Sequence, residues 1–414
     1  MSLSSSMDIS TPKRRIAHGH AARDNIGDEL LVRAIQDGLR RRLDRWELEF
    51  SELYSQDTEG EGKREIGPAL TIPSRKRIIE SVRDADAVLI GGGELIGPFH
   101  EYIHTSLYAA QLGIPHLWLG VGGSFDGGRT ERRFLKQALC TANMVATRDS
   151  LCYSDLSKSL KAGNLIDGRD LVFDLSLPST STTREKTIVV TLRGSERPDR
   201  WWDAEAFATI ATMLRQAQIS GYTVHLLPFL SNQDAAVVGS PNLDTQFHSD
   251  EDVAEFVSRR LISEQTETTV VGRSIEKATS VIGSARFLVG MRLHSLVIAA
   301  KLGTPFIALD YAPKVQRMVG MLGMTDYMIS PEDFDHKLPV LITQYMQDNE
   351  LTTASDLLSK RIPELQASAG KVLDTAARIL DQSFSLPNHH TNLMAGATRV
   401  LHDMFLRAVI KNPA

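Results

Sequence analysis

Short apolar runs alternate along the chain with longer segments whose apolar residues recur at helical spacing. The clearest example begins with Phe287–Val289, an apolar run that predicts a buried strand. A helical pattern follows over Leu296–Leu302, and Phe306–Leu309 predicts the next strand. In parallel α/β units of this kind, the loop after each strand opens at the carboxyl edge of the sheet, where ligands collect. Arg292 and His294 fall on such a predicted loop.

The first half of the chain carries the same alternation. Helical spacing covers Leu30–Leu39 and Tyr102–Leu112, whereas Ala87–Ile90, His116–Leu119 and Met144–Ala146 are apolar runs typical of buried strands. Strands and helices thus alternate in both halves, which predicts an α/β fold with parallel sheets flanked by helices.

Three glycine-containing segments follow or precede these elements. Gly91–Gly93 and Gly120–Gly123 come directly after apolar runs and predict loops that a ligand can approach closely. Their spacing does not match a dinucleotide fingerprint, which disfavours a nicotinamide enzyme. Asn25–Glu29 precedes a helical pattern and fits either a capped helix start or a phosphate-binding loop.

The two ends of the chain carry the weakest patterns. Residues 1–22 predict a flexible segment in which Arg14–His20 would form at best a weak first strand, and Trp46–Tyr54 predicts a second strand. Residues 386–414 predict a C-terminal helix with one apolar face, formed by Leu393, Ala397, Leu401, Met404 and Ala408. Because its polar face is not strongly basic, we expect this helix to pack against the protein rather than on a membrane surface.

A polar linker divides the chain. Pro178–Thr183 is a run of small hydroxyl residues after a proline, and Thr187–Thr191 begins a new apolar strand. We therefore expect an N-terminal Rossmann-like domain over residues 23–178 and a second over residues 179–385.

Composition narrows the class of protein. A chain of 414 residues with 42% hydrophobic residues is long enough for two domains, and a formal net charge of -5 argues against a dedicated nucleic-acid binder. The two cysteines give neither a disulfide framework nor a cysteine-rich metal site. No apolar run approaches the roughly 18 residues that a membrane span needs, and the start lacks a signal-peptide core. We expect a cytoplasmic protein.

Cationic residues gather on the predicted loops at sheet edges: Arg148, Arg193, Arg292 and Lys314, with the imidazole of His294 beside them. Each alone is often structural, Arg292 as an ion-pairing residue and His294 as a satisfied core histidine. Together they predict a site for a small substrate bearing phosphate and carboxylate, because Arg binds such groups bidentately and His transfers protons near neutral pH.

At this point the chain resembles the polysaccharide pyruvyl transferase family over roughly Asn25 to Gly323. The resemblance rests on Asn25–Glu29, Gly91–Gly93 and its strand, Gly120–Gly122, Arg148–Asp149, Arg193, Arg292–Leu–His294, Gly303-x-Pro305 and Tyr311-x-x-Lys314. It implies two Rossmann-like domains in a GT-B-like arrangement with the site in the interdomain cleft. It also implies phosphoenolpyruvate as donor and a sugar hydroxyl pair of a cell-surface or exported glycan as acceptor, giving a pyruvate ketal and phosphate.

That chemistry assigns roles to residues of this sequence. His294 is the candidate general acid or base, and Arg292 beside it, with Arg148, Arg193 and Lys314, would hold phosphate and carboxylate. The remaining candidates for substrate binding are Asn25, Gly92 and Gly93 on the predicted loops, and Asp28 and Glu94, which would orient sugar hydroxyls. No step requires a metal or another cofactor.

Two other functions remain open. A GT-B-type glycosyltransferase that uses a nucleotide sugar would have the same layout, since fold does not fix function. A non-catalytic glycan-binding component of a polymer-synthesis complex would bind acceptor without turning over a donor. A lipid-linked rather than free acceptor, peripheral association with the inner face of the membrane and self-association are open as well.

Overall fold

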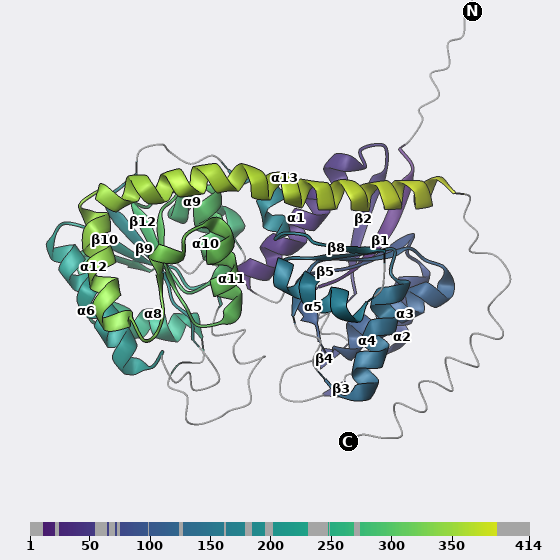
Figure 1. Cartoon of the computed structure of the whole chain (residues 1–414), viewed down its shortest axis with the longest axis horizontal. Coiled ribbons are helices and arrows are strands. Elements are labelled where there is room, and N and C mark those ends of the chain that lie inside the picture. Colours follow the sequence, from purple (N-terminus) through teal and green to yellow (C-terminus); the bar gives the residue numbers. More distant parts are fainter. Residues whose placement is uncertain are drawn as a thin grey trace, which may run out of the picture.

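The computed structural model describes residues 11–20, 25–53, 64–65, 71–72, 75–97, 99–123, 127–160, 163–178, 184–194, 202–230, 247, 249–268 and 274–386. These residues form two α/β domains side by side (Figure 1), which confirms the predicted fold class. The predicted helix beyond residue 386 lies outside the described residues. Within them, no helix has the length and apolar character that crossing a membrane requires.

The first domain is built on a six-stranded parallel sheet in the order β2-β1-β5-β6-β7-β8. Its strands are β1 (Lys13–Gly19), β2 (Glu47–Glu52), β5 (Ala87–Ile96), β6 (His116–Gly123), β7 (Met144–Thr147) and β8 (Leu165–Ile166). Its helices are α1 (Ile26–Arg42), α2 (Arg75–Arg83), α3 (His100–Leu112), α4 (Arg129–Thr141) and α5 (Ser150–Ser159), followed by the 3-10 turn η1 (Leu171–Asp174). A separate antiparallel pair joins β3 (Arg64–Glu65) to β4 (Thr71–Ile72).

The second domain repeats the design with the strand order β11-β10-β9-β12-β13-β14, again parallel. Its strands are β9 (Thr187–Thr191), β10 (Thr223–Leu226), β11 (Thr266–Thr268), β12 (Phe287–Gly290), β13 (Phe306–Leu309) and β14 (Met328–Ile329). Its helices are α6 (Ala204–Ile219), α8 (Asp250–Ser258), α9 (Ile275–Ser284), α10 (Leu293–Lys301), α11 (Pro313–Leu322) and α12 (Phe334–Met346), with 3-10 turns η2 (Ser263–Gln265) and η3 (Thr325–Tyr327).

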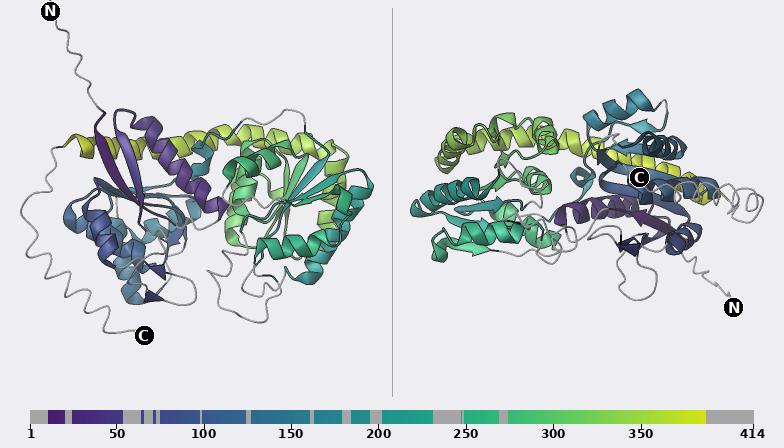
Figure 2. Two further views of the ribbon diagram at one scale, coloured as in Figure 1. Left: turned by 180° about the vertical axis from the view of Figure 1, so that it is seen from behind. Right: turned by 90° about the horizontal axis from the view of Figure 1, so that it is seen from below.

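The final helix, α13 (Asn349–Ser385), has 37 residues and crosses both domains (Figure 2). Its first part packs on the second domain, where Tyr327 Oη donates to Glu350. Its last part packs on the first domain, where Arg42 donates to Asp374 across 2.5 Å. Residues 349–385 thus belong to the second domain in sequence and cover both domains in space.

Strand β1 corrects the expectation of a weak first strand. It runs for seven residues in the interior of the sheet, paired with β2 and β5. The charges at its start have partners on the neighbouring strand β2 and just before it: Lys13 pairs with Glu49, and the Arg14 guanidinium lies 4.7 Å from the centre of the Trp46 ring. Ile16 then enters the core with no exposed surface.

The glycine clusters also differ from the prediction, because strands β5 and β6 continue through them. A Cβ on Gly91 would lie 2.4 Å from the carbonyl oxygen of Leu119, so glycine lets the two strands pair closely. A Cβ on Gly92 would lie 2.9 Å from Leu31 of α1, and Gly92 has a φ of 81°. Both glycines therefore have a packing reason for their presence.

The apolar core joins the two domains. Helices α2 to α5 pack on one face of the first sheet, whereas α1, η1 and α13 cover the other. The cluster on that second face continues without interruption into the second domain, through residues such as Phe173 of η1 and Leu296 of α10. The junction between the domains is therefore partly a buried apolar contact.

Candidate active site

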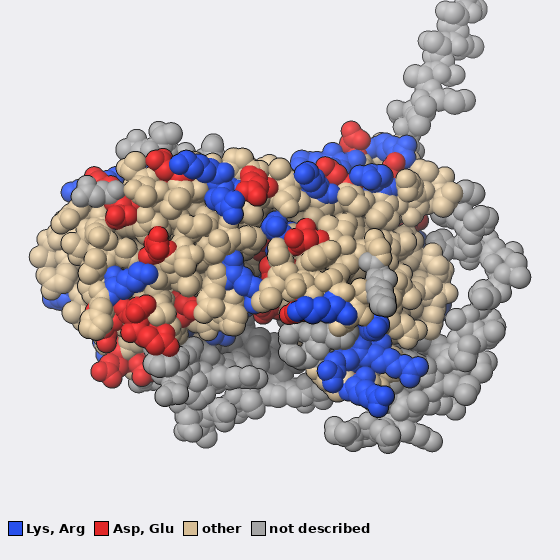
Figure 3. All heavy atoms as spheres, viewed as in Figure 1, with Lys and Arg blue, Asp and Glu red and all other residues tan. Residues whose placement is uncertain are grey.

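Both sheets reverse their strand order next to the junction between the domains. The order changes direction between β1 and β5 in the first sheet, and between β9 and β12 in the second. Ligands of open α/β sheets bind outside the carboxyl ends of strands at such switch points. Asn25 follows β1, Arg193 follows β9 and Arg292 follows β12, which places these candidates at the two switch points. Figure 3 shows cationic and acidic side chains along the junction.

His294 lies in the first turn of α10 rather than on a loop, which corrects the prediction. His294 is 8% exposed, and its Nε2 atom lies 3.4 Å from Oδ2 of Asp170 in the first domain. A Cβ on Gly27 would lie 2.3 Å from His294 Nδ1, so only glycine lets the first turn of α1 pack against the imidazole. The ring of a second-domain residue is thus enclosed by two segments of the first domain.

Asn25 is the N-cap of α1, as the capped-helix interpretation predicted. Its Oδ1 accepts from the backbone N–H of Gly27 at 3.0 Å, and its Nδ2 donates to Asp28 at 3.1 Å. Asn25 also forms an isolated antiparallel bridge with Leu230 of the second domain. The start of α1 is therefore fixed at the junction between the domains, beside His294.

Asp28, in the first turn of α1, interacts electrostatically with four of the predicted site residues. Burial raises the pKa of Asp28, while His294, Lys314, Arg148 and Arg292 act in the opposite direction through their charges. These four residues come from both domains, so the site is shared between them.

This shift gives a testable pH dependence. A carboxyl group whose pKa is raised by folding stabilises the protein most below the pKa of the unfolded chain, about 3.9, and loses that contribution as the pH rises through the folded value. We therefore expect Asp28→Asn to be more stable than the parent at neutral pH, with the difference disappearing in acid. Thermal unfolding at several pH values measures it; a difference that grows in acid would contradict the expectation.

Glu94 links the two domains. Arg148 donates to its Oε1 at 2.9 Å from the first domain, and Lys314 donates to its Oε2 at 3.4 Å from α11 of the second. Although burial raises the pKa of Glu94, the charges of Lys314 and Arg148 lower it below its usual value. The Arg148 side chain is 6% exposed and that of Glu94 is 43% exposed. Two predicted donor-binding cations therefore share one accessible carboxylate.

Lys314 was expected on a loop and instead lies in the first turn of α11. Its Nζ lies 5.9 Å from the centre of the Tyr311 ring, and the Arg193 guanidinium lies 4.8 Å from the same centre. Among the described residues, Arg193 has no carboxylate partner.

Arg292, by contrast, is committed to an ion pair. Its Nε donates to Asp250 at 2.7 Å, and one terminal nitrogen donates to the other carboxylate oxygen. The Asp250 side chain has no exposed surface and also accepts from the backbone N–H groups of Gly194, Phe229 and Leu230. The structural role that the sequence left open for Arg292 is thus present, and only its second terminal nitrogen remains for a ligand.

Several residues of this site were missed from the sequence. Asp170 and Asp250 hold His294 and Arg292, and Arg317 Nε of α11 lies 3.4 Å from Asp149 across the domains. Asp149 caps α5 shortly after β7, and Asp170 caps η1 shortly after β8, whereas Asp250 opens α8 at a distance from the preceding strand β10. The rule that selected the cations, position after a strand, could also have found Asp149 and Asp170, but not Asp250.

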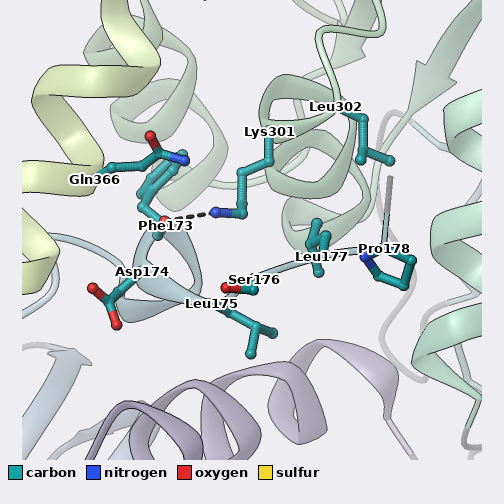
Figure 4. A pocket seen from close by; sticks show the side chains of 9 residues that line it. All are labelled: Phe173, Asp174, Leu175, Ser176, Leu177, Pro178, Lys301, Leu302 and Gln366. Atoms are coloured by element: carbon teal, nitrogen blue, oxygen red, sulfur yellow. Dashed lines mark hydrogen bonds between the residues drawn. The ribbon is translucent and has the colours of Figure 1, made fainter. Parts of the chain in front are cut away.

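A cavity of about 620 Å³ lies elsewhere, at the opposite end of α10 from His294 (Figure 4). It is lined by η1, the segment after it, the end of α10 and α13, through Phe173, Asp174, Leu175, Ser176, Leu177, Pro178, Lys301, Leu302 and Gln366. None of the predicted site residues lines it. Within the part of the chain described here, no group of three or more His, Cys, Asp or Glu side chains is arranged to hold a metal ion.

Solved structures show the same two-domain fold. A UDP-GlcNAc 2-epimerase from Neisseria meningitidis bound to UDP-GlcNAc superposes with a TM-score of 0.53 at 10% identity, covering 88% of this chain and 100% of that one. The S. aureus MnaA–UDP structure has a TM-score of 0.53 at 10% identity, and the match covers 92% of this chain and 100% of that one. A trehalose 6-phosphate synthase from Burkholderia multivorans has a TM-score of 0.50 at 9% identity, and the match covers 92% of this chain and 100% of that one. At these identities the likeness shows the GT-B-like fold alone.

Sequence comparison identifies the family. No curated protein sequence matches the chain. The family model of polysaccharide pyruvyl transferase matches residues 25–313, which include Asn25, Arg148, Arg193, Arg292 and His294. The match covers most of the chain and both switch points. The chain therefore belongs to the polysaccharide pyruvyl transferase family.

Proposed function

We propose that this protein transfers pyruvate from phosphoenolpyruvate to two hydroxyl groups of a sugar in a cell-surface or exported glycan, forming a pyruvate ketal and releasing phosphate. The observation that carries the proposal is that cations and one imidazole from both domains meet at the junction: Arg148 and Lys314 share Glu94, and the His294 ring packs against the start of α1. Phosphoenolpyruvate bears a phosphate and a carboxylate close together, and this charge distribution suits two or more cations with a nearby proton donor. Family membership supports the same reaction class.

The proposed reaction needs one proton donor and acceptors for two hydroxyl protons. A proton adds to the methylene carbon of the donor and leaves an oxocarbenium-like centre at the neighbouring carbon. One sugar hydroxyl adds there and loses its proton, and the C–O bond to phosphate then breaks. The second hydroxyl adds to the resulting centre and loses its proton, which closes the ketal. One hydroxyl proton balances the proton delivered to carbon, and the other leaves with phosphate or solvent.

The site residues suit these steps. His294 would deliver the first proton and accept one from a hydroxyl group. Arg193, which has no carboxylate partner among the described residues, would bind the donor bidentately. Arg148 and Lys314 would exchange their shared Glu94 partner for a donor oxyanion, leaving Glu94 to accept a hydrogen bond from the sugar. Arg292 would contribute charge and the N–H donors that its pair with Asp250 leaves unused.

A glycosyltransferase using a nucleotide sugar is the second candidate, because two of the similar structures contain UDP or UDP-GlcNAc. Incubating the protein with candidate acceptors and either phosphoenolpyruvate or nucleotide sugars separates the two. The proposal requires phosphate release matched by a pyruvate ketal in the mass spectrum of the acceptor. Glycosyl transfer without ketal formation would favour the second candidate, and acceptor binding without turnover of either donor would favour a glycan-binding component.

Donor binding is expected to stabilise the fold. A ligand that binds only the folded state adds about 2.7 kcal/mol at a concentration of 100 times its Kd. We expect saturating phosphoenolpyruvate to raise the melting temperature clearly, and nucleotide sugars to raise it weakly. Differential scanning fluorimetry measures both, with inorganic phosphate as the control for a simple anion effect. The reverse ranking would move the assignment to the glycosyltransferase.

Transfer is also expected to survive exhaustive chelation. In the proposed reaction, cationic side chains perform the charge stabilisation that a metal ion supplies in other transferases. Activity is measured after dialysis against EDTA and again after adding back single divalent metals. Complete loss with recovery on one metal would show that the acidic residues of the site serve a different purpose.

A further inference from the structure

His294 and Asp170 face each other across the domain junction. Asp170 has no exposed surface, and its Oδ1 accepts from the backbone N–H of Val172 at 3.0 Å, which caps η1. Its Oδ2 lies 3.4 Å from His294 Nε2. Neither of these two atoms makes another hydrogen bond among the described residues. A small movement that shortened their separation would satisfy both at once.

The segment that carries Asp170 is held firmly. Asp174, at the end of η1, forms ion pairs with Arg41 and with Arg42 of α1. Lys301 Nζ, at the end of α10, donates to the carbonyl oxygen of Phe173 at 2.6 Å (Figure 4). His294 and Lys301 lie about two turns apart and therefore on one face of α10. Helix α10 is thus placed against η1 near both of its ends.

Asp170 also has reason to stay ionised. Burial raises the pKa of Asp170, but its close contact and charge interaction with His294, together with the charge of Arg148, bring the pKa below its usual value. The other ring nitrogen of His294, Nδ1, faces Gly27 and the start of α1. Asp28, in the first turn of α1, interacts through charge with His294, Lys314, Arg148 and Arg292, and Arg148 also acts on Asp170. One nitrogen is therefore directed toward a buried carboxylate and the other toward the start of α1, where Asn25 and Asp28 lie.

We infer that Asp170 is the positioning residue of this enzyme: the first domain supplies the carboxylate that orients His294 of the second domain and stabilises its imidazolium form. The inference rests on the proposed function and names a residue of that same site. Asp170 accepts the Nε2–H hydrogen bond throughout and takes up no proton. The proton at Nδ1 passes to the methylene carbon of the donor, and the neutral imidazole regains a proton at Nδ1 from a sugar hydroxyl group. The acid is complete only when the two domains are together.

The test compares Asp170→Asn with the parent and with Asp174→Asn. Asparagine at position 170 keeps an oxygen that can cap Val172 and removes the charge, whereas Asp174→Asn disrupts ion pairs in the same turn without touching His294. We expect Asp170→Asn to lower kcat on the order of a hundred-fold with little change in KM for phosphoenolpyruvate. We expect the His294 ring, followed by NMR and assigned by its absence in His294→Asn, to titrate differently in Asp170→Asn and in the parent, because the neighbouring charge is gone.

The control separates positioning from stability. Asp174→Asn is expected to lower the melting temperature while leaving kcat and the His294 titration at parental values. A folded Asp170→Asn with parental kcat, or with an unchanged His294 titration, overturns the inference. If the parent itself transfers no pyruvate, the proposed function fails, and the titration alone then decides whether Asp170 controls His294. If Asp170→Asn does not fold, the same measurements are made on Asp170→Ser, whose hydroxyl group can cap η1.

Discussion

His294→Asn is expected to lose pyruvyl transfer by on the order of a hundred- to ten-thousand-fold, because a positioned acid or base contributes about that much to rate. Asparagine keeps a polar side chain of smaller size and removes the titratable proton. The imidazole is enclosed by Gly27 and Asp170, so the variant retains polar contacts in the same space. We therefore expect it to fold and to bind phosphoenolpyruvate.

Transfer rate, donor affinity and thermal unfolding are measured on the same preparations of this variant. His116→Asn is a matched control, because His116 is a buried histidine of β6 whose burial lowers its pKa to about 4. That substitution is expected to affect stability without a specific loss of rate. A folded His294→Asn that binds donor and transfers pyruvate at the parental rate would remove His294 from the mechanism, and an unfolded one would indicate a structural histidine.

Arg292→Met is expected to lower the free energy of unfolding by about 3 kcal/mol, because it leaves the Asp250 carboxylate buried without its charged partner. Asp250 also accepts hydrogen bonds from three backbone N–H groups, which continue to stabilise its charge in the variant. The expected loss of stability is therefore at the low end of the range for broken buried ion pairs. Arg292→Lys keeps the charge and loses the two-point contact, so its stability falls less. We expect the lysine variant also to bind phosphoenolpyruvate more weakly, since the remaining N–H donors are lost.

Arg33→Met is the control for removing an arginine. Arg33 pairs with Glu276 between α1 and α9, and both side chains are about half exposed, so its loss is expected to cost less than about 1 kcal/mol. Urea unfolding measures all three variants. Parental stability in Arg292→Met, together with lost donor binding, would mean that Arg292 serves the donor rather than Asp250. Parental donor affinity and transfer rate in Arg292→Lys would make Arg292 structural and leave Arg148 and Arg193 as the donor-binding arginines.

The strand and helix pattern of this protein is largely local, and the sequence predicts it well. Strands β9 and β13 begin and end where their apolar runs do, because buried parallel strands are apolar on both faces. The errors occur where a local signal has a long-range cause. Strand β1 looked weak because its cations Lys13 and Arg14 obtain their partners from segments distant in sequence, Glu49 for Lys13 and the Trp46 ring for Arg14. The glycines of β5 looked like a loop, and they instead admit the close approach of β6 and α1.

The sequence by itself determined the α/β class, the family and the set of cations, because strand ends in a parallel fold lie along one edge and the motif residues follow them. Only the tertiary structure decided which charges meet. Asp250 and Arg292 are far apart in sequence, as are Asp170 and His294, and their pairing depends on how loops and domains pack. The same holds for Glu94, shared by Arg148 and Lys314. Coulomb and hydrogen-bond energies fall off over a few ångströms, so position along the chain cannot assign these partners.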